Sequence, residues 1–215
     1  MTLAMSPSLQ QSLDAMTVPG ILVSHRMIMV GDEQALLPEE VGAFANSVSK
    51  VRRASAAARI VARDLLPRLG ALPQPIPKST SGMPIWPTGI VGSLAHDSSV
   101  AVAAVALGRD FSAVGIDVEP DEALDPDLID IVATERERQA IGNDGHRARL
   151  LFAVKEAVYK AAYPLDGVFL DHHNVEVCLE TGTATVQNGR LLRFRYCVAA
   201  YIVALAFVAA GSRGP

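Results

Sequence analysis

Two apolar runs near the middle of the chain constrain its fold most. The runs Ser99–Leu107 and Ala113–Val118 consist mainly of small and β-branched residues, and Gly108–Asp110 separates them. Continuous apolar runs of this length, bounded by turn residues, are typical of buried β-strands. Helical segments are expected on both sides of them, so the sequence predicts the α+β class with a division near residue 110.

The other long elements are predicted from periodicity and from helix-breaking residues. A strand is expected over Ile21–Val30, and a helix over Pro38–Leu69. Two more helices are expected over Asp125–Ile141 and Gly145–Ala162, and Pro164 is expected to stop the second one.

The remaining segments are predicted to be loops, hairpins or mobile ends. The stretch Ala71–Gly92 is rich in proline and glycine and is expected to be a long loop or a boundary. Alternation after Leu170 predicts antiparallel hairpins that end in a strand around Val198–Val208. Ser6–Gln11 and Gly211–Pro215 are expected to be mobile.

The composition excludes several classes of protein. The chain has 215 residues, of which 50% are hydrophobic, and a net charge of −4, so it supports a real core and is not intrinsically disordered. It has no run of basic residues such as nucleic-acid binding normally requires. The longest uncharged apolar stretch, Tyr196–Ala210, has fifteen residues. A membrane-spanning helix needs roughly 17 to 25, so this stretch is predicted to be a buried strand.

The compartment is predicted from the basic residues and the cysteines. The first basic residue is Arg26, so no charged region precedes an apolar segment as it does in a secretory signal. Cys178 and Cys197 lie in apolar or alternating runs, where a small buried thiol is the ordinary interpretation. We therefore expect a reducing, cytoplasmic environment.

The motif VGIDVEP, residues 114–120, combines a strand pattern with two carboxylates. In a strand, Asp117 and Glu119 point to one face, while Ile116 and Val118 point to the other. Oxygen ligands at this spacing suit Mg²⁺, which completes its coordination with water and substrate phosphate oxygens. The alternative is a solvated strand end.

The motif FAVKEAVYK, residues 152–160, lies in the last predicted helix. Glu156 and Lys160 are one turn apart, in the order that favours an ordinary surface ion pair. In the alternative interpretation, Glu156 is a third carboxylate for the metal, and Lys155 and Lys160 lie beside the phosphates that the metal binds.

Two further groups of polar residues precede these motifs. His96 follows a glycine-containing segment just before a predicted strand, where ligands often approach the backbone, although a structural histidine is the alternative. The helix predicted before it carries four arginines, for which a solvated helix face is the default interpretation: Arg52, Arg53, Arg59 and Arg63.

Taken in this order and at these separations, the segments resemble the 4′-phosphopantetheinyl transferases of the Sfp-like superfamily. The subgroup that they resemble most is that of enterobactin synthase component D and the actinobacterial carrier-protein activators. The shared features span about residues 50–165 and are KVRRASAAARIVARDLL, Lys78 followed by GMPIWPTGIVGSLAH, VGIDVEP, and LLFAVKEAVYKAAYPL. The pairing of GIDVE with FAVKEAVYK is the specific part of this resemblance.

The resemblance implies a metal site and a set of basic contacts. Asp117, Glu119 and Glu156 match the acidic positions that bind Mg²⁺ or Mn²⁺ together with the pyrophosphate of coenzyme A. Lys155 and Lys160 match the two lysines of the family's KE motif.

Further matches concern the rest of coenzyme A. His96 matches a histidine that contacts it, and Lys78 and Arg59 match basic positions at its 3′-phosphate and adenosine end. Ala95 stands where the family usually has Ser or Thr, and Val51, next to Arg52, stands where an Arg is common. These two departures concern the adenosine end and leave the metal and pyrophosphate positions intact.

The resemblance also implies an activity. A 4′-phosphopantetheine arm would pass from coenzyme A to a serine of an apo acyl or peptidyl carrier protein, with release of 3′,5′-ADP. Lys160 is the candidate for stabilising the leaving phosphate, His96 for orienting the pyrophosphate, and Glu156 for accepting the serine proton. Fatty acid, polyketide, nonribosomal peptide and siderophore synthesis all use such carriers, and the protein is expected to act as a monomer.

Two alternatives stand beside this activity. One is a catalytically silent module that binds coenzyme A and carrier proteins, and the other is a Mg²⁺-dependent phosphohydrolase. For architecture, the resemblance implies two similar α/β subdomains in a pseudo-twofold arrangement with the active site in the cleft between them. Residues 1–110 would contact the adenosine end, and residues 111–215 would carry the metal site and the KE helix.

Overall fold

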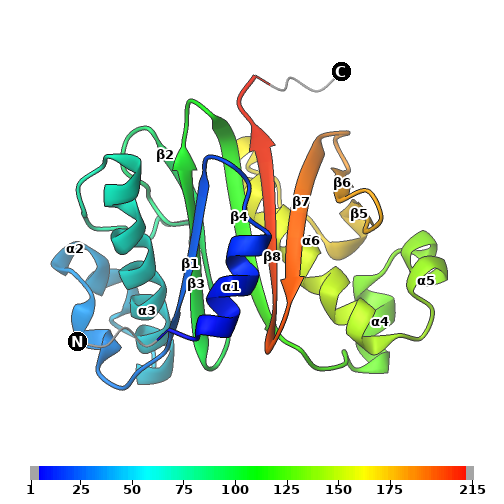
Figure 1. Ribbon diagram of the computed structural model, residues 1–215, viewed down its shortest axis with the longest axis horizontal. Coiled ribbons are helices and arrows are strands. Elements are labelled where there is room, and N and C mark those ends of the chain that lie inside the picture. Colours follow the sequence, from blue (N-terminus) through cyan, green and yellow to red (C-terminus); the bar gives the residue numbers. More distant parts are fainter. Residues whose placement is uncertain (1–4, 212–215) are drawn as a thin grey trace.

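Two antiparallel sheets stand side by side in the computed structural model, which describes residues 5–211 (Figure 1). The N-terminal sheet has the order β1-β3-β2, and the C-terminal sheet has the order β4-β8-β7-β6-β5. Their strands are β1 (Ile21–Met27), β2 (Ile90–His96), β3 (Val100–Leu107), β4 (Phe111–Pro120), β5 (Val175–Cys178), β6 (Thr183–Val186), β7 (Leu191–Val198) and β8 (Tyr201–Ala209). This mixture of helices and antiparallel strands confirms the α+β prediction.

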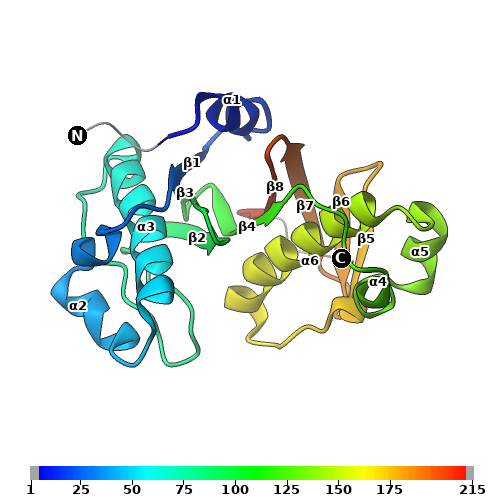
Figure 2. The same ribbon diagram turned by 90° about the horizontal axis from the view of Figure 1, so that it is seen from below.

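The two central apolar runs form strands, but in different sheets. β3 pairs with β1 and β2, and β4 pairs with β8, so the turn Gly108–Asp110 carries the chain from one sheet to the other. β2 lies next to β4 at the junction of the sheets (Figure 2). One sheet has three strands and the other has five, and the pseudo-twofold relation between them stays a prediction.

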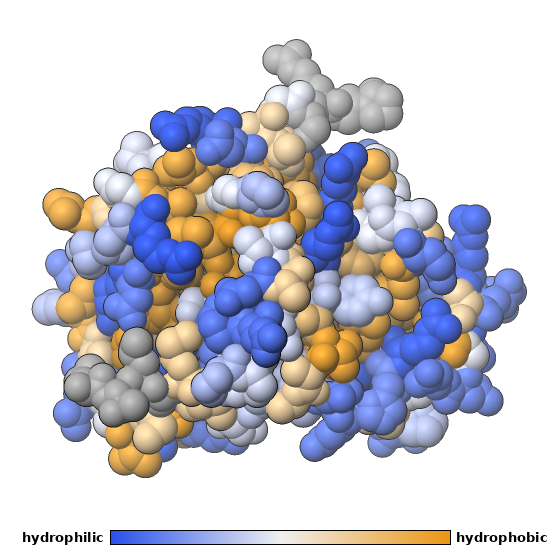
Figure 3. Space-filling view, viewed as in Figure 1, coloured by the Kyte–Doolittle hydropathy of each residue, from blue (hydrophilic) through white to orange (hydrophobic). Residues whose placement is uncertain are grey.

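Helices cover both sides of the sheets. α3 (Ser49–Leu65) packs against the N-terminal sheet and α6 (Gly145–Asp166) against the C-terminal sheet, both on the same side (Figure 2). α1 (Pro7–Ala15) covers the opposite side. On the outer face shown in Figure 3, hydrophilic side chains lie over α1 and hydrophobic ones show beside it.

The ordered α1 contradicts the prediction that Ser6–Gln11 is mobile. The Ser6 side chain caps the helix by accepting a hydrogen bond from the Leu9 backbone N–H, and Leu9 and Leu13 are buried. These leucines belong to a core cluster that also contains Val102 of β3 and Ile116 of β4, so α1 stabilises both sheets at once. Of the tail that was also expected to be mobile, residues 212–215 lie outside the described part of the chain.

Three predicted boundaries in and beside the strands and helices need correction, because local capping and packing override the patterns. The segment Pro38–Leu69 is interrupted after α2 (Pro38–Val41), where the Phe44 side chain inserts into the interior before α3 begins. The loop predicted up to Gly92 ends earlier, because β2 starts at Ile90. The single strand predicted over Tyr196–Ala210 is divided between β7 and β8.

The C-terminal helices also differ from the prediction. The helix expected over Asp125–Ile141 is divided into α4 (Pro126–Val132) and α5 (Glu135–Ile141), because Thr134 forms a capping box that starts the second one. Pro164 does not stop α6, which continues to Asp166 and ends at Gly167 in the left-handed conformation. In the last turn of a helix, proline removes only one backbone donor.

Two surface properties complete the fold. Cys178 is exposed and Cys197 is partly buried, so the prediction of two buried thiols is wrong for Cys178. Within residues 5–211, no helix combines the length and the apolar character that crossing a membrane requires.

Candidate active site

Close packing of α6 on β4 brings the two acidic motifs together. A Cβ atom at Gly115 of β4 would overlap the carbonyl oxygen of Ala157 and lie 2.6 Å from the backbone nitrogen of Ala161. Only glycine therefore permits this helix to approach the strand so closely. As a result, Asp117, two residues along β4, lies beneath the Lys160 side chain of α6.

Asp117 is a buried carboxylate with one oxygen unsatisfied. Asp117 is 6% exposed, and its Oδ1 accepts a hydrogen bond of 2.5 Å from Lys160 Nζ. Oδ2 is buried and has no hydrogen-bond partner among the described residues. Burial raises the pKa of this carboxyl, Lys160 opposes that shift, and the negative charge of Glu156 adds to it. An unsatisfied buried carboxylate oxygen is costly unless a cation or donor approaches it.

The two other predicted carboxylates lie near Asp117 but are turned toward protein partners. Glu156 Oε1 lies 3.1 Å from His172 Nε2, and this hydrogen bond is the main reason why the pKa of Glu156 is lowered. Glu119 accepts a hydrogen bond of 2.9 Å from Arg149 Nη1. Burial and the charge of Asp117 nevertheless raise the pKa of Glu119.

The donor set suits a hard divalent cation, although the site is not assembled as a cage. Within residues 5–211, no group of three His, Cys, Asp or Glu side chains is arranged to hold a metal ion. The oxygen donors are nevertheless those that Mg²⁺ takes, usually one or two carboxylates with water and phosphate. The free Oδ2 of Asp117 is the point at which such an ion fits this structure.

A pocket of about 360 Å³ adjoins this cluster at the junction of the sheets. Lys160 lines it from α6, together with Tyr159 and Tyr163. β2, the start of β4 and the loop before β2 supply the other walls, and Trp86 of that loop packs so closely on Gly92 that a Cβ there would overlap the indole. The pocket therefore lies where a ligand would contact both sheets and Lys160.

His96 and Lys78 lie on the N-terminal side of this region. His96 is exposed at the end of β2, and Lys160 is near enough to contribute to lowering its pKa, although partial desolvation is the larger cause. Lys78 is exposed at the base of a tight hairpin that bridges to Pro84, and its Nζ lies 5.8 Å from the centroid of the Phe44 ring. The tip of that hairpin, Ser81–Met83, lines the pocket.

Two predicted contact residues are not brought to this cluster. Lys155 is 1% exposed and pairs with Glu137 at 2.6 Å, on a different face of α6 from Lys160. Arg59 is 4% exposed and donates through Nε to the carbonyl of Ile76 at 2.8 Å. Burial lowers the pKa of both side chains. Both side chains therefore lie in the interior of this structure, and their roles as coenzyme A contacts stay predictions.

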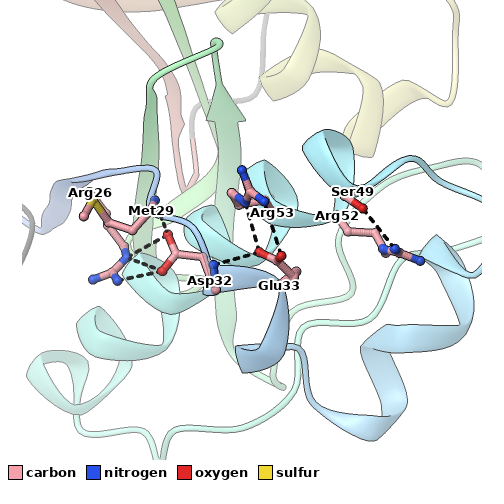
Figure 4. A network of polar contacts seen from close by, with 8 residues as sticks. Arg26, Met29, Asp32, Glu33, Ser49, Arg52 and Arg53 are labelled. Carbon is pink, nitrogen blue, oxygen red and sulfur yellow. Dashed lines mark hydrogen bonds and ion pairs between the residues drawn. The ribbon is translucent and has the colours of Figure 1, made fainter.

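The other arginines of α3 are not simply solvated either. Arg53 donates to Glu33 at 3.0 Å, and Arg52 donates to Ser49 at 3.3 Å (Figure 4). Glu33 belongs to a 3-10 turn (Asp32–Ala35). Asp32, the first residue of this turn, pairs with Arg26 of β1 at 2.7 Å. This network fastens the turn between β1 and the start of α3.

Sequence reasoning missed His172 and Arg149, the partners of the outer carboxylates. Arg149 precedes Glu156 by seven residues, or two helical turns, so helical periodicity places it on the same face as Glu156 and Lys160. His172 lies in a 3-10 turn (His172–Asn174) after α6, where no periodic signal relates it to Glu156.

Two segments of the chain match models of known protein families. Residues 38–106 match the 4′-phosphopantetheinyl transferase N-terminal domain, and residues 113–206 match the 4′-phosphopantetheinyl transferase superfamily. The two matched segments meet near the turn between β3 and β4. The pocket and the acidic cluster lie beside that junction.

Three curated relatives are similar over most of the chain. The 4′-phosphopantetheinyl transferase Npt of Nocardia iowensis is 37% identical over 80% of this chain and 80% of its own length. PptT of Mycobacterium tuberculosis is 38% identical over 73% of this chain and 70% of its own length. Svp of Streptomyces mobaraensis is 38% identical over 73% of this chain, and the match spans 66% of its length, slightly less than two thirds. The chain therefore belongs to the 4′-phosphopantetheinyl transferase superfamily.

Proposed function

We propose that this protein transfers 4′-phosphopantetheine from coenzyme A to a serine of an apo carrier protein, in a reaction that requires Mg²⁺ or Mn²⁺. The observation that carries the proposal is the unsatisfied Oδ2 of Asp117, buried beside Lys160 at the pocket between the sheets. A site that leaves a buried carboxylate oxygen bare is suited to a cation that arrives with its substrate. The names of the curated relatives agree with this activity.

The proposed binding mode places coenzyme A across the junction of the sheets. Its pyrophosphate would lie against Lys160, with His96 at the end of β2 orienting it and Lys78 serving the adenosine end. Asp117, Glu119 and Glu156 would hold the divalent ion, which supplies positive charge that neutralises the pyrophosphate oxygens. Lys155 and Arg59 are left out of this binding mode because both are buried.

The proposed reaction is an in-line displacement at phosphorus. The serine Oγ attacks the phosphorus that carries the pantetheine arm, and the bond from that phosphorus to the bridging oxygen breaks. The bridging oxygen leaves with 3′,5′-ADP, and Lys160 stabilises its developing negative charge. Glu156 accepts the serine proton, and its lowered pKa keeps it ionised for that role.

The decisive experiment is incubation with coenzyme A, Mg²⁺ and an apo carrier protein, followed by mass spectrometry of the carrier. We expect a mass gain of one phosphopantetheine, lost on chelation of the metal and in Asp117→Asn. The matched control is Asp110→Asn, because Asp110 is exposed at the turn between the sheets. An unchanged carrier with bound coenzyme A would indicate the silent module, and coenzyme A breakdown without a carrier would indicate the hydrolase.

A further inference from the structure

Lys155 is the most deeply buried charge of the C-terminal half. Its side chain is 0% exposed, and its Nζ lies 2.6 Å from Glu137 Oε2 of α5. The same nitrogen donates a hydrogen bond of 2.7 Å to the backbone carbonyl of His172. Lys155 therefore ties the turn that contains His172 to α6 and α5.

Glu137 is itself held rigidly. Its Oε2 accepts the backbone N–H of Thr134 and its Oε1 accepts the backbone N–H of Val177, both at 2.7 Å. The carboxylate thus joins the start of α5, the strand β5 and Lys155. Three fixed donors leave Glu137 little freedom, so the position of Lys155 is defined by the fold.

His172 extends this chain of contacts to the acidic cluster. While its carbonyl accepts from Lys155, its ring lies 3.1 Å from Glu156 Oε1 through Nε2 and packs on Phe152 at 5.4 Å between centroids. A carboxylate only accepts, so Nε2 carries the hydrogen in this contact. The contact occupies one oxygen of Glu156 and leaves the other available.

We propose that Lys155 and His172 are positioning residues. Lys155 fixes the backbone of His172, and the His172 ring fixes the carboxylate of Glu156, which lies near enough to Asp117 and Lys160 to interact with both electrostatically. This inference rests on the proposed function, because Glu156 needs a fixed orientation only if it acts in the transfer reaction. Partners of this kind orient metal-binding and catalytic carboxylates, and their loss typically costs about 10- to 100-fold in affinity or activity.

The test compares His172→Phe with His172→Gln and His173→Phe. Phenylalanine keeps the ring on Phe152 but removes the donor, so we expect kcat/KM for the apo carrier to fall about 10- to 100-fold. Glutamine restores a donor and should recover most of this loss. His173→Phe is the matched control, since the one hydrogen bond that the His173 ring makes among the described residues is to the Asp130 carbonyl, at 3.0 Å.

A second readout does not depend on turnover. Nitrogen NMR of the His172 imidazole in the metal-free protein should show the hydrogen on Nε2, and Glu156→Leu should change that signal. Mn²⁺ titrated in the presence of coenzyme A should bind about 10-fold more weakly to His172→Phe than to the wild type. A wild-type NMR signal with the hydrogen on Nδ1 alone would overturn the positioning role.

The role of Lys155 is tested in a variant that leaves neither Lys155 nor Glu137 as an unpaired buried charge. The double variant Lys155→Met with Glu137→Gln removes both charges, and it should fold but reproduce the kinetic defect of His172→Phe. Wild-type kcat/KM in the double variant, or in His172→Phe, would refute the inference while leaving the proposed function intact. If the wild type itself transfers nothing, the proposed function fails instead, and the NMR result then decides whether the contact exists.

Discussion

The two halves of the molecule each bury a carboxylate near their long helix, but they satisfy it differently. In the N-terminal half, Glu40 is 0% exposed and accepts hydrogen bonds of 2.8 to 2.9 Å from Arg63 and from the backbone N–H groups of Leu37 and Ile76. In the C-terminal half, Asp117 accepts one from Lys160 at Oδ1, and its Oδ2 is bare within the described structure.

This difference separates a structural carboxylate from a functional one. A carboxylate whose oxygens are both saturated by fixed donors joins elements and has no capacity left for a ligand. An unsaturated one costs stability and is retained where a ligand supplies the missing partner. By this criterion Glu40 and Glu137 support the fold, and Asp117 belongs to the proposed site.

The largest effect is expected from Gly115→Ala, which would separate α6, and with it Lys160, from β4 and Asp117. The new Cβ would overlap the Ala157 carbonyl, so we expect a loss of more than about 4 kcal/mol of unfolding free energy, or no folded protein. Urea unfolding measures it. Gly42→Ala is the control, because no atom lies within 4 Å of a Cβ there, and its stability should stay near that of the wild type.

The second variant tests whether Glu40 stabilises the N-terminal half. Glu40→Ala leaves Arg63 and Arg59 buried without their partner, so unfolding should become easier by about 3 to 5 kcal/mol. Glu39→Ala, on the exposed side of the same short helix, should change little in the same urea titration. Equal stability of the two variants would contradict the structural role of Glu40.

Asp117→Asn tests the functional side. We expect phosphopantetheine transfer to fall at least about 100-fold, or about 2.7 kcal/mol. Stability at neutral pH should change by less than about 1 kcal/mol, because the amide oxygen still accepts from Lys160, whose side chain is 29% exposed. Because burial raises the folded-state pKa of Asp117, its contribution to stability is present at low pH and is lost as the pH rises through that value. The asparagine variant should lack this pH-dependent loss, and a large loss of its stability at neutral pH would argue against our distinction.

The smallest effect is expected from protonation of His25, because Nε2 accepts a hydrogen bond only while the ring is neutral. His25 is 2% exposed; its Nε2 accepts the Ser6 backbone N–H at 2.8 Å, and Nδ1 faces Gln10 Oε1 at 3.2 Å. Burial lowers the pKa of His25, so its stabilising effect is present above pH 6.5 and is lost as the pH falls toward the folded-state pKa. Hydrogen exchange in α1, corrected for intrinsic rates, should rise modestly at pH 5.5 in the wild type, and unchanged protection would contradict this.

The sequence predicted the central strands well, since these depend on local periodicity, whereas the metal site of Asp117, Glu119 and Glu156 stays a prediction. It predicted Lys155 poorly because adjacent residues on a helix point about 100° apart, so Lys155 and Glu156 do not face the same site. α1 was missed because its two buried leucines gain their value only from strands far away in the chain. Arg59 looked solvated because the Glu40 and Phe44 contacts that bury it come from a separate segment.

The core cluster beneath α1 contains residues of both sheets, so both sheets depend on the N-terminal segment. The segments that match the family begin at residue 38, so they omit both α1 and β1. A shortened chain starting there would leave one edge of β3 without its hydrogen-bonding neighbour and would uncover apolar side chains of both sheets. Such an edge is a template for aggregation, so the boundaries of sequence similarity in this protein are not those of an autonomous folding unit.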